Sequence, residues 1–221
     1  MDGHVVTHAD VGAFLVRLLR LDKGAVVRLR PVSPTGVVEL WAMLPFEVLA
    51  TRRVSYEVPE DTTVAAAELL AALEDPSRVP RRRDEAWRWA LPPGRGEAVE
   101  QIPALELTRV AAAASRTLRQ ATQEGVGGRA VGERMLRDAL LDHVAIAVTG
   151  TDGQRVDIPQ RVIQAAVRMG FLGRVTYGSE ATDSDASTTD HVTVRLAMAW
   201  IGVDASYGSV WYRPSYPLRF R

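Results

Sequence analysis

The chain has 221 residues, 47% of them hydrophobic, and this is enough to bury the core of one large domain or two small ones. Its 27 basic and 27 acidic residues balance, so no overall charge attracts nucleic acid or anionic lipid. The sequence contains no cysteine, which excludes disulfides, thiolate metal sites, iron–sulfur clusters and cysteine nucleophiles.

Two further features of the composition bear on location and origin. No stretch approaches the roughly 18–20 consecutive apolar residues that span a bilayer. The opening "MDGHVVTHAD" also lacks the basic and apolar regions of a secretory signal, so we expect a cytoplasmic protein. Lys23 is the only lysine among the basic residues, and alanine, valine and glycine are abundant. This bias is more typical of a GC-rich bacterial genome than of an arginine-specific function.

The first half of the chain predicts a small α+β unit. An apolar stripe predicts a helix over 8–21 that ends at Gly24. The stretches "AVVRLRP" and "VVELWAML" predict two strands, and a third is expected after Pro45. We expect this meander, 25–58, to pack one face against the first helix. Apolar residues at helical spacing predict a second helix over 62–74.

The segment 75–103 has no clear periodicity and is rich in proline and glycine, which predicts a connector. Within it, "RRRDEAWRWALPP" begins at Arg81 and contains two tryptophans. Because tryptophan is unusual in an exposed linker, we expect Trp87 and Trp89 to attach the connector to the protein core. In an extended segment, two residues that are two apart point to the same side.

The second half predicts three further helices, a hairpin and three strands. The helical pattern of 130–142 is expected to bury Met135 and Ala139 among its apolar residues. The hairpin is formed by "HVAIAV" and "RVDIP". The predicted helices and strands are 104–123, 130–142, 159–170, 173–178, 191–201 and 207–213. The fold class predicted is α+β, with two small subdomains of helices and antiparallel strands, 1–74 and 104–221, packed together and joined by 75–103.

The sequence contains no convincing motif for a catalytic, cofactor-binding or metal site. "GVGGRAVGE" contains the letters of a dinucleotide fingerprint, but a predicted helix precedes it where that motif needs a strand. His4 and His8 have the spacing of two ligands on one helix face near Asp10, without a glutamate base between them. We predict no catalytic residue, cofactor or metal, and an enzyme whose site is assembled from distant residues stays a second alternative.

Two arginine-containing stretches are candidates for an interaction surface. The first would stack bases on its tryptophans while its arginines hold phosphates. The second is a stripe on the helix 159–170 that has the residue types used to read base edges. The candidate residues are Arg81, Arg82, Arg83, Trp87, Arg88, Trp89, Arg161, Gln164 and Arg168.

The leading hypothesis is a non-catalytic bacterial protein that acts by binding another protein or a copy of itself. The first alternative is a nucleic-acid-binding regulatory protein that uses the two arginine-containing stretches. A membrane partner is not expected, because no apolar span is present.

Overall fold

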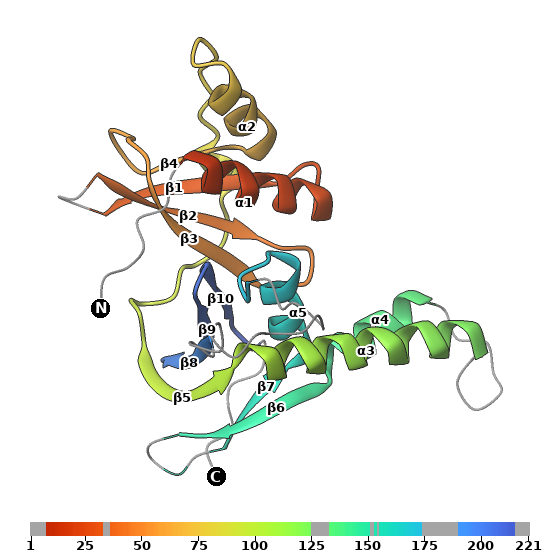
Figure 1. Cartoon of the computed structure of the whole chain (residues 1–221). Coiled ribbons are helices and arrows are strands. Elements are labelled where there is room, and N and C mark those ends of the chain that lie inside the picture. Colours follow the sequence, from red (N-terminus) through yellow and green to blue (C-terminus); the bar gives the residue numbers. More distant parts are fainter. Residues whose placement is uncertain are drawn as a thin grey trace, which may run out of the picture.

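The computed structural model describes residues 8–32, 36–124, 133–150, 153, 155–173 and 190–214. It is 35% helix and 36% strand, and its sheets are antiparallel, so the chain has the predicted α+β fold (Figure 1). No helix of the described residues is long and apolar enough to cross a membrane.

The first half contains helices and strands that agree closely with the sequence pattern. In chain order they are α1 (His8–Leu21), β1 (Val26–Val32), β2 (Val37–Met43), β3 (Leu49–Ser55), β4 (Thr62–Ala65) and α2 (Ala66–Glu74). The predicted first helix and the three-stranded meander are confirmed, and α1 packs on the meander as expected.

A short 3₁₀ helix, η1 (Asp84–Ala86), lies between the two halves. The second half then contains β5 (Glu97–Pro103), α3 (Ala104–Glu124), α4 (Glu133–Asp142), β6 (Val144–Thr149), β7 (Arg155–Pro159), α5 (Gln160–Arg168), β8 (His191–Ala197), β9 (Trp200–Ala205) and β10 (Gly208–Tyr212). The predicted hairpin is confirmed as the separate two-stranded sheet β6–β7.

One eight-stranded sheet runs through both halves of the chain, in the order β4-β1-β2-β3-β10-β9-β8-β5. The halves meet where β3 pairs with β10, with Leu49 opposite Trp211 and Thr51 opposite Ser209. Because backbone hydrogen bonds cross this junction, the two halves share one sheet as well as a side-chain interface. The edge strands of the sheet are β4 and β5.

The two faces of this sheet carry different side chains, because successive residues of a strand point to opposite faces. On β2, Val38, Leu40 and Ala42 belong to the main core, which lies under the helices. α1 contacts β3 and α5 contacts β10, and Figure 1 shows α1 along β1 and β2 and α5 beside β10. The opposite face, which we call the outer face, holds a second cluster of buried residues: Trp41, Leu49, Ala197, Trp200 and Trp211.

Three helices begin directly at the end of a strand. The strands β4, β5 and β7 run into α2, α3 and α5 without an intervening loop residue. At two of these junctions the last strand residue is a proline, Pro103 or Pro159. Proline fits such a position because its fixed φ suits both an extended residue and the start of a helix.

Several sequence expectations differ from the structure. The predicted helix 62–74 begins only at Ala66, because residues 62–65 form β4 and pair with β1. The last seven residues of the predicted connector form β5, which pairs with β8. The single predicted strand 191–201 is two strands, with a turn at Met198 and Ala199 between β8 and β9.

The α4 helix is present, but its expected burial is wrong. Met135 is 67% exposed and Ala139 is exposed too. α4 packs mainly against α3 and α5, and the partly covered side that it turns to them holds Leu136, Leu140 and Leu141 instead. The predicted strand 173–178 lies almost entirely outside the described residues.

Candidate interaction surface at the strap

The segment 81–96, which we call the strap, closes one edge of the sheet. The Arg83 backbone N–H donates to the Thr63 carbonyl at 2.7 Å, and the Thr63 N–H donates to the Asp84 carboxylate at 2.8 Å. Val64 and Arg82 form an isolated β-bridge. The strap therefore satisfies backbone groups of β4 that would otherwise be open to pairing with another strand.

Carboxylates hold the arginines at the start of the strap. Arg82 pairs with Glu60 and Asp84, and the Arg83 guanidinium donates to Glu68 at 2.8 Å. The Arg82 side-chain hydrogen bond, followed by the Thr63 N–H, lowers the pKa of Asp84. The Arg81 backbone N–H and then the Arg83 side chain lower the pKa of Glu68. Two of the three consecutive arginines thus make ion pairs within the chain.

The two tryptophans of the strap have different surroundings. Trp87 packs against the outer-face cluster, together with Leu91. Its indole N–H donates to the Trp89 carbonyl at 2.7 Å, and the Arg28 guanidinium lies 5.8 Å from its ring centroid. Trp89 meets Trp87 edge to face, with ring centroids 5.2 Å apart, and is 37% exposed. Trp87 is therefore largely covered, while the Trp89 ring has a free face.

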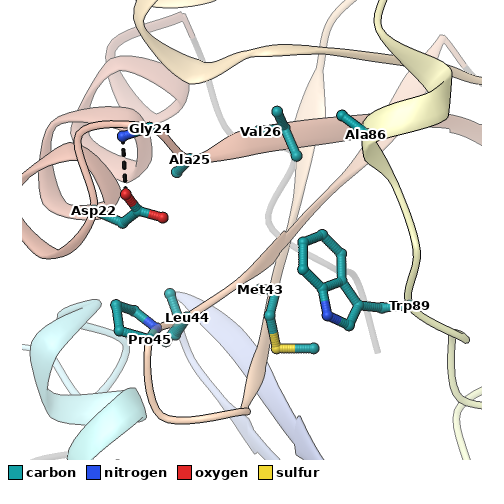
Figure 2. A pocket seen from close by; sticks show the side chains of 9 residues that line it. All are labelled: Asp22, Gly24, Ala25, Val26, Met43, Leu44, Pro45, Ala86 and Trp89. Carbon is teal, nitrogen blue, oxygen red and sulfur yellow. Dashed lines mark hydrogen bonds between the residues drawn. The ribbon is translucent and has the colours of Figure 1, made fainter.

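The free face of Trp89 forms one wall of a pocket of about 400 Å³, which is in the size range of small-ligand sites. Figure 2 shows the Trp89 ring beside Met43, with Leu44 and Pro45 opposite. The remaining walls are Asp22, Gly24, Ala25, Val26 and Ala86. The pocket thus lies at the end of the sheet where β1 begins and β2 ends, beneath the strap.

Among the described residues that line this pocket, Asp22 is the only ionisable one. One of its carboxylate oxygens accepts the Gly24 N–H at 2.8 Å, and the other is turned away from that bond (Figure 2). The pocket is therefore mostly apolar, with one negative charge at its rim. Such a lining suits an apolar side chain that has a positive charge nearby.

The other candidate residues lie apart from this pocket. Arg81 and Arg88 are exposed on the strap. On α5, Arg168 is exposed and Gln164 is half-buried. Arg161 is only 11% exposed: it donates to the Phe46 carbonyl at 3.0 Å. It also pairs with Glu47 and Asp142. The candidate residues of the strap therefore lie together in the structure. The candidate residues of α5 form no common surface with them.

Sequence reasoning selected one wall of the pocket and missed the others. Trp89 belongs to the aromatic pattern of the strap, whereas Asp22 and Pro45 lie in two distant turns and Met43 ends β2. Those residues carry no motif, and only the pairing of β1 with β2 places them together. Among the described residues, no group of three or more potential metal ligands is present. His4 lies outside that part of the chain.

Comparison with protein families follows the two halves of the chain. A family model described as "Domain of unknown function (DUF8185)" matches residues 91–217, more than half of the sequence. The chain belongs to the DUF8185 family. A second model, described as "Domain of unknown function (DUF8010)", matches residues 5–89. The two matches meet within the strap of this DUF8185 protein. No curated protein matches its sequence.

Solved structures resemble the DUF8185 chain in fold. The DNA polymerase III subunit beta from Pseudomonas aeruginosa superposes with a TM-score of 0.54 at 13% sequence identity. The beta sliding clamp of Caulobacter crescentus gives 0.51 at 10% identity, and the DNA polymerase III beta subunit of Thermotoga maritima gives 0.50 at 10%. Each comparison covers 96% of this chain and only 64–65% of the other. The fold is therefore sliding-clamp-like.

Proposed function

We propose that this DUF8185 protein is a non-catalytic binding protein, and that the pocket beside Trp89 receives an apolar side chain of a protein partner. The observation that carries the proposal is the free face of Trp89, held over an apolar pocket by a strap that is itself fastened to the sheet. Exposed aromatic rings at the wall of an apolar pocket are typical anchors in protein interfaces.

The fastening of the strap supports a binding role because it forms the site in advance. Arg82, Arg83 and Asp84 fix one end of the strap, and Gly96 accepts a hydrogen bond from Arg195 near the other. A wall that is held in place loses little conformational entropy when a ligand binds. The likeness to proteins named as sliding clamps and polymerase subunits gives further support, since those names describe parts of an assembly.

Selection from a displayed library of random peptides tests this proposal. Sequences with an apolar anchor should be enriched on the wild-type protein, and titration should change its tryptophan emission more than that of Trp89→Ala, since the chain has five tryptophans. The variants Trp89→Ala and Pro45→Glu should weaken binding of the selected peptides by at least about tenfold, the loss expected for an interface anchor. Val79→Glu is the matched control, because Val79 is 88% exposed and does not line the pocket. Equal binding by all variants would contradict the proposal.

Nucleic-acid binding is the second candidate function, and one observation favours α3 over the strap as its surface. Arg109, Arg116 and Arg119 are exposed on one side of α3, because positions seven and three apart share a helix face. No carboxylate of the described residues pairs with them, in contrast to Arg82 and Arg161. Free arginines at this spacing suit contacts with phosphate groups.

Electrophoretic shifts with double-stranded DNA, measured over a series of salt concentrations, test this second candidate. Binding through these arginines should weaken steeply as salt rises, and replacement of all three by alanine should reduce the slope by about 2–3. Replacing Arg81, Arg88 and Arg168 gives a matched control, since it removes the same charge from other exposed positions. An equal loss in both triple variants would reveal a general charge effect and dismiss α3 as a specific surface.

A further inference from the structure

The turn between β8 and β9 has an unusual residue at its tip. Ala197 pairs directly with Trp200, so Met198 and Ala199 form a two-residue turn. Met198 has φ +54° and is 87% exposed. Glycine normally occupies such a position, because a side chain is disfavoured at positive φ. The chain thus presents a large apolar side chain at a place where glycine would fold more easily.

A residue that is both strained and exposed to solvent points to a role outside folding. The Met198 side chain contributes almost no buried surface within the chain. Methionine is also well suited to interfaces, since its unbranched, polarisable side chain adapts to the shape of a pocket. These features favour Met198 as a contact residue for another molecule.

Met198 and the pocket lie at the same end of the sheet. The pairings Met43–Leu49, Leu49–Trp211, Trp211–Gly202 and Ala197–Trp200 connect the strands in turn, and they place the end of β2 and the β8–β9 turn at one end of the sheet. Four strand spacings separate β2 from β8, which amounts to about 19 Å at about 4.8 Å per strand. Met198 is therefore too far away to enter the pocket of its own chain.

We propose that Met198 of one copy enters the Trp89 pocket of a second copy. This inference rests on the proposed function, since it names the occupant of that binding site. Met198 and the pocket lie at the same end of the sheet. Two copies related by a twofold axis can therefore each place Met198 in the pocket of the other. Such an isologous arrangement closes on itself and gives a dimer instead of a filament.

The charges beside the two surfaces are complementary. Asp22 gives the pocket rim a negative charge. Arg95 precedes Gly96, which lies against Ala197 next to the turn. The Arg95 side chain is 68% exposed, and its guanidinium is 3.7 Å from Asp204. An exposed guanidinium held at this distance can turn toward a carboxylate of the second copy at little cost.

The absence of native cysteine allows a direct test by disulfide trapping. A chain with Met198→Cys is mixed with a chain carrying Pro45→Cys and oxidised mildly. A covalent dimer of the two chains is expected, since a disulfide needs Cα atoms within about 7 Å. The matched control pairs Met198→Cys with Val79→Cys, two positions of nearly equal exposure. Absence of the first cross-link, or equal formation of both, would overturn the proposal.

A second variant separates self-association from folding. Met198→Gly removes the side chain and also the positive-φ strain, so its thermal midpoint should equal or exceed that of the wild type when both are measured at a dilution at which the wild type is monomeric. Its dimer dissociation constant, measured by sedimentation, should rise by at least about tenfold. A monomeric wild-type protein, or unchanged dimerisation of this variant, would refute the inference. If Trp89→Ala still abolishes peptide binding in that case, the proposed function stands without it.

Discussion

Gly202 lies directly under the indole of Trp211 on the outer face of the sheet. The two residues are opposite each other on β9 and β10. A Cβ atom at position 202 would lie 2.6 Å from the nearest ring carbon, closer than real Cβ contacts allow. The Trp211 ring thus occupies the space that a side chain at position 202 would take, so only glycine fits there.

Gly202→Ala should lower the free energy of unfolding by about 1–3 kcal/mol, because the indole must move out of a packed cluster. Urea denaturation followed by far-ultraviolet circular dichroism measures this loss. Gly12→Ala is the control: Gly12 is in α1, with no atom within 4 Å of an added Cβ. That change should stabilise the protein by about 0.5–1 kcal/mol. Two substitutions of the same kind are thus expected to act in opposite directions.

At the scale of elements, the strap depends on carboxylates whose pKa is lowered in the folded protein. Arg82 and the Thr63 N–H favour ionised Asp84, and the Arg81 N–H and Arg83 favour ionised Glu68. A carboxyl group with a depressed folded-state pKa stabilises the fold above its unfolded pKa, and this contribution is lost as pH falls through the folded value. Acid should therefore weaken the attachment of the strap to β4.

Asp84→Asn should flatten the acid side of the stability profile. In the wild type, the urea midpoint should begin to fall near the ordinary pKa values of 3.8 for aspartate and 4.5 for glutamate, and continue below them. The variant should begin less stable at neutral pH and lose less over the same interval. Glu74→Gln serves as the control, since no described residue forms an ion pair with this exposed carboxylate. Parallel profiles for wild type and Asp84→Asn would argue against a role of the strap in acid stability.

The elements that the sequence predicts well are those with a strong period. Helices α1, α3 and α5 and the hairpin β6–β7 agree with their apolar patterns. The edge strand β5 was missed because Glu97, Glu100 and Gln101 are exposed and do not alternate with buried residues. The turn at Met198 was missed because no glycine marks it.

The candidate site was predictable only in part, for a related reason. The strap can be recognised in the sequence because three arginines and two tryptophans occur within a short stretch. Its partners, Thr63 and Glu68, have no local signal and meet it only because β4 is an edge strand. The pocket depends in the same way on the α1–β1 and β2–β3 turns. Contacts between distant segments require the sheet order, which periodicity does not contain.

At the scale of the whole molecule, the shared sheet couples the two halves. The β3–β10 pairing supplies backbone bonds, and the Arg17 guanidinium donates to the Met169 carbonyl at 2.8 Å across the same boundary. Phe14 also stacks on Phe171, with ring centroids 6.3 Å apart. Main-chain bonds, a charged hydrogen bond and aromatic packing thus all span the junction.

We therefore expect the chain to unfold as one cooperative unit, although two family models divide it. Unfolding curves from tryptophan fluorescence and from circular dichroism should coincide in urea. Val210→Pro, which places a proline in the central strand β10, should shift both curves together to lower urea. Two separated transitions in the wild-type protein would contradict this coupling.

The way in which the strap covers β4 also has a consequence for the lifetime of the protein. A piece of the same chain occupies the position that a neighbouring strand would take, so sheet growth stops at that side. Proteolytic nicking between α2 and η1 would leave this piece attached to β4 only by its ion pairs and hydrogen bonds, so that it can come away while the strands stay in place. The bared edge could then recruit further copies strand by strand, so a single cut would turn a self-limiting sheet into a seed for aggregation.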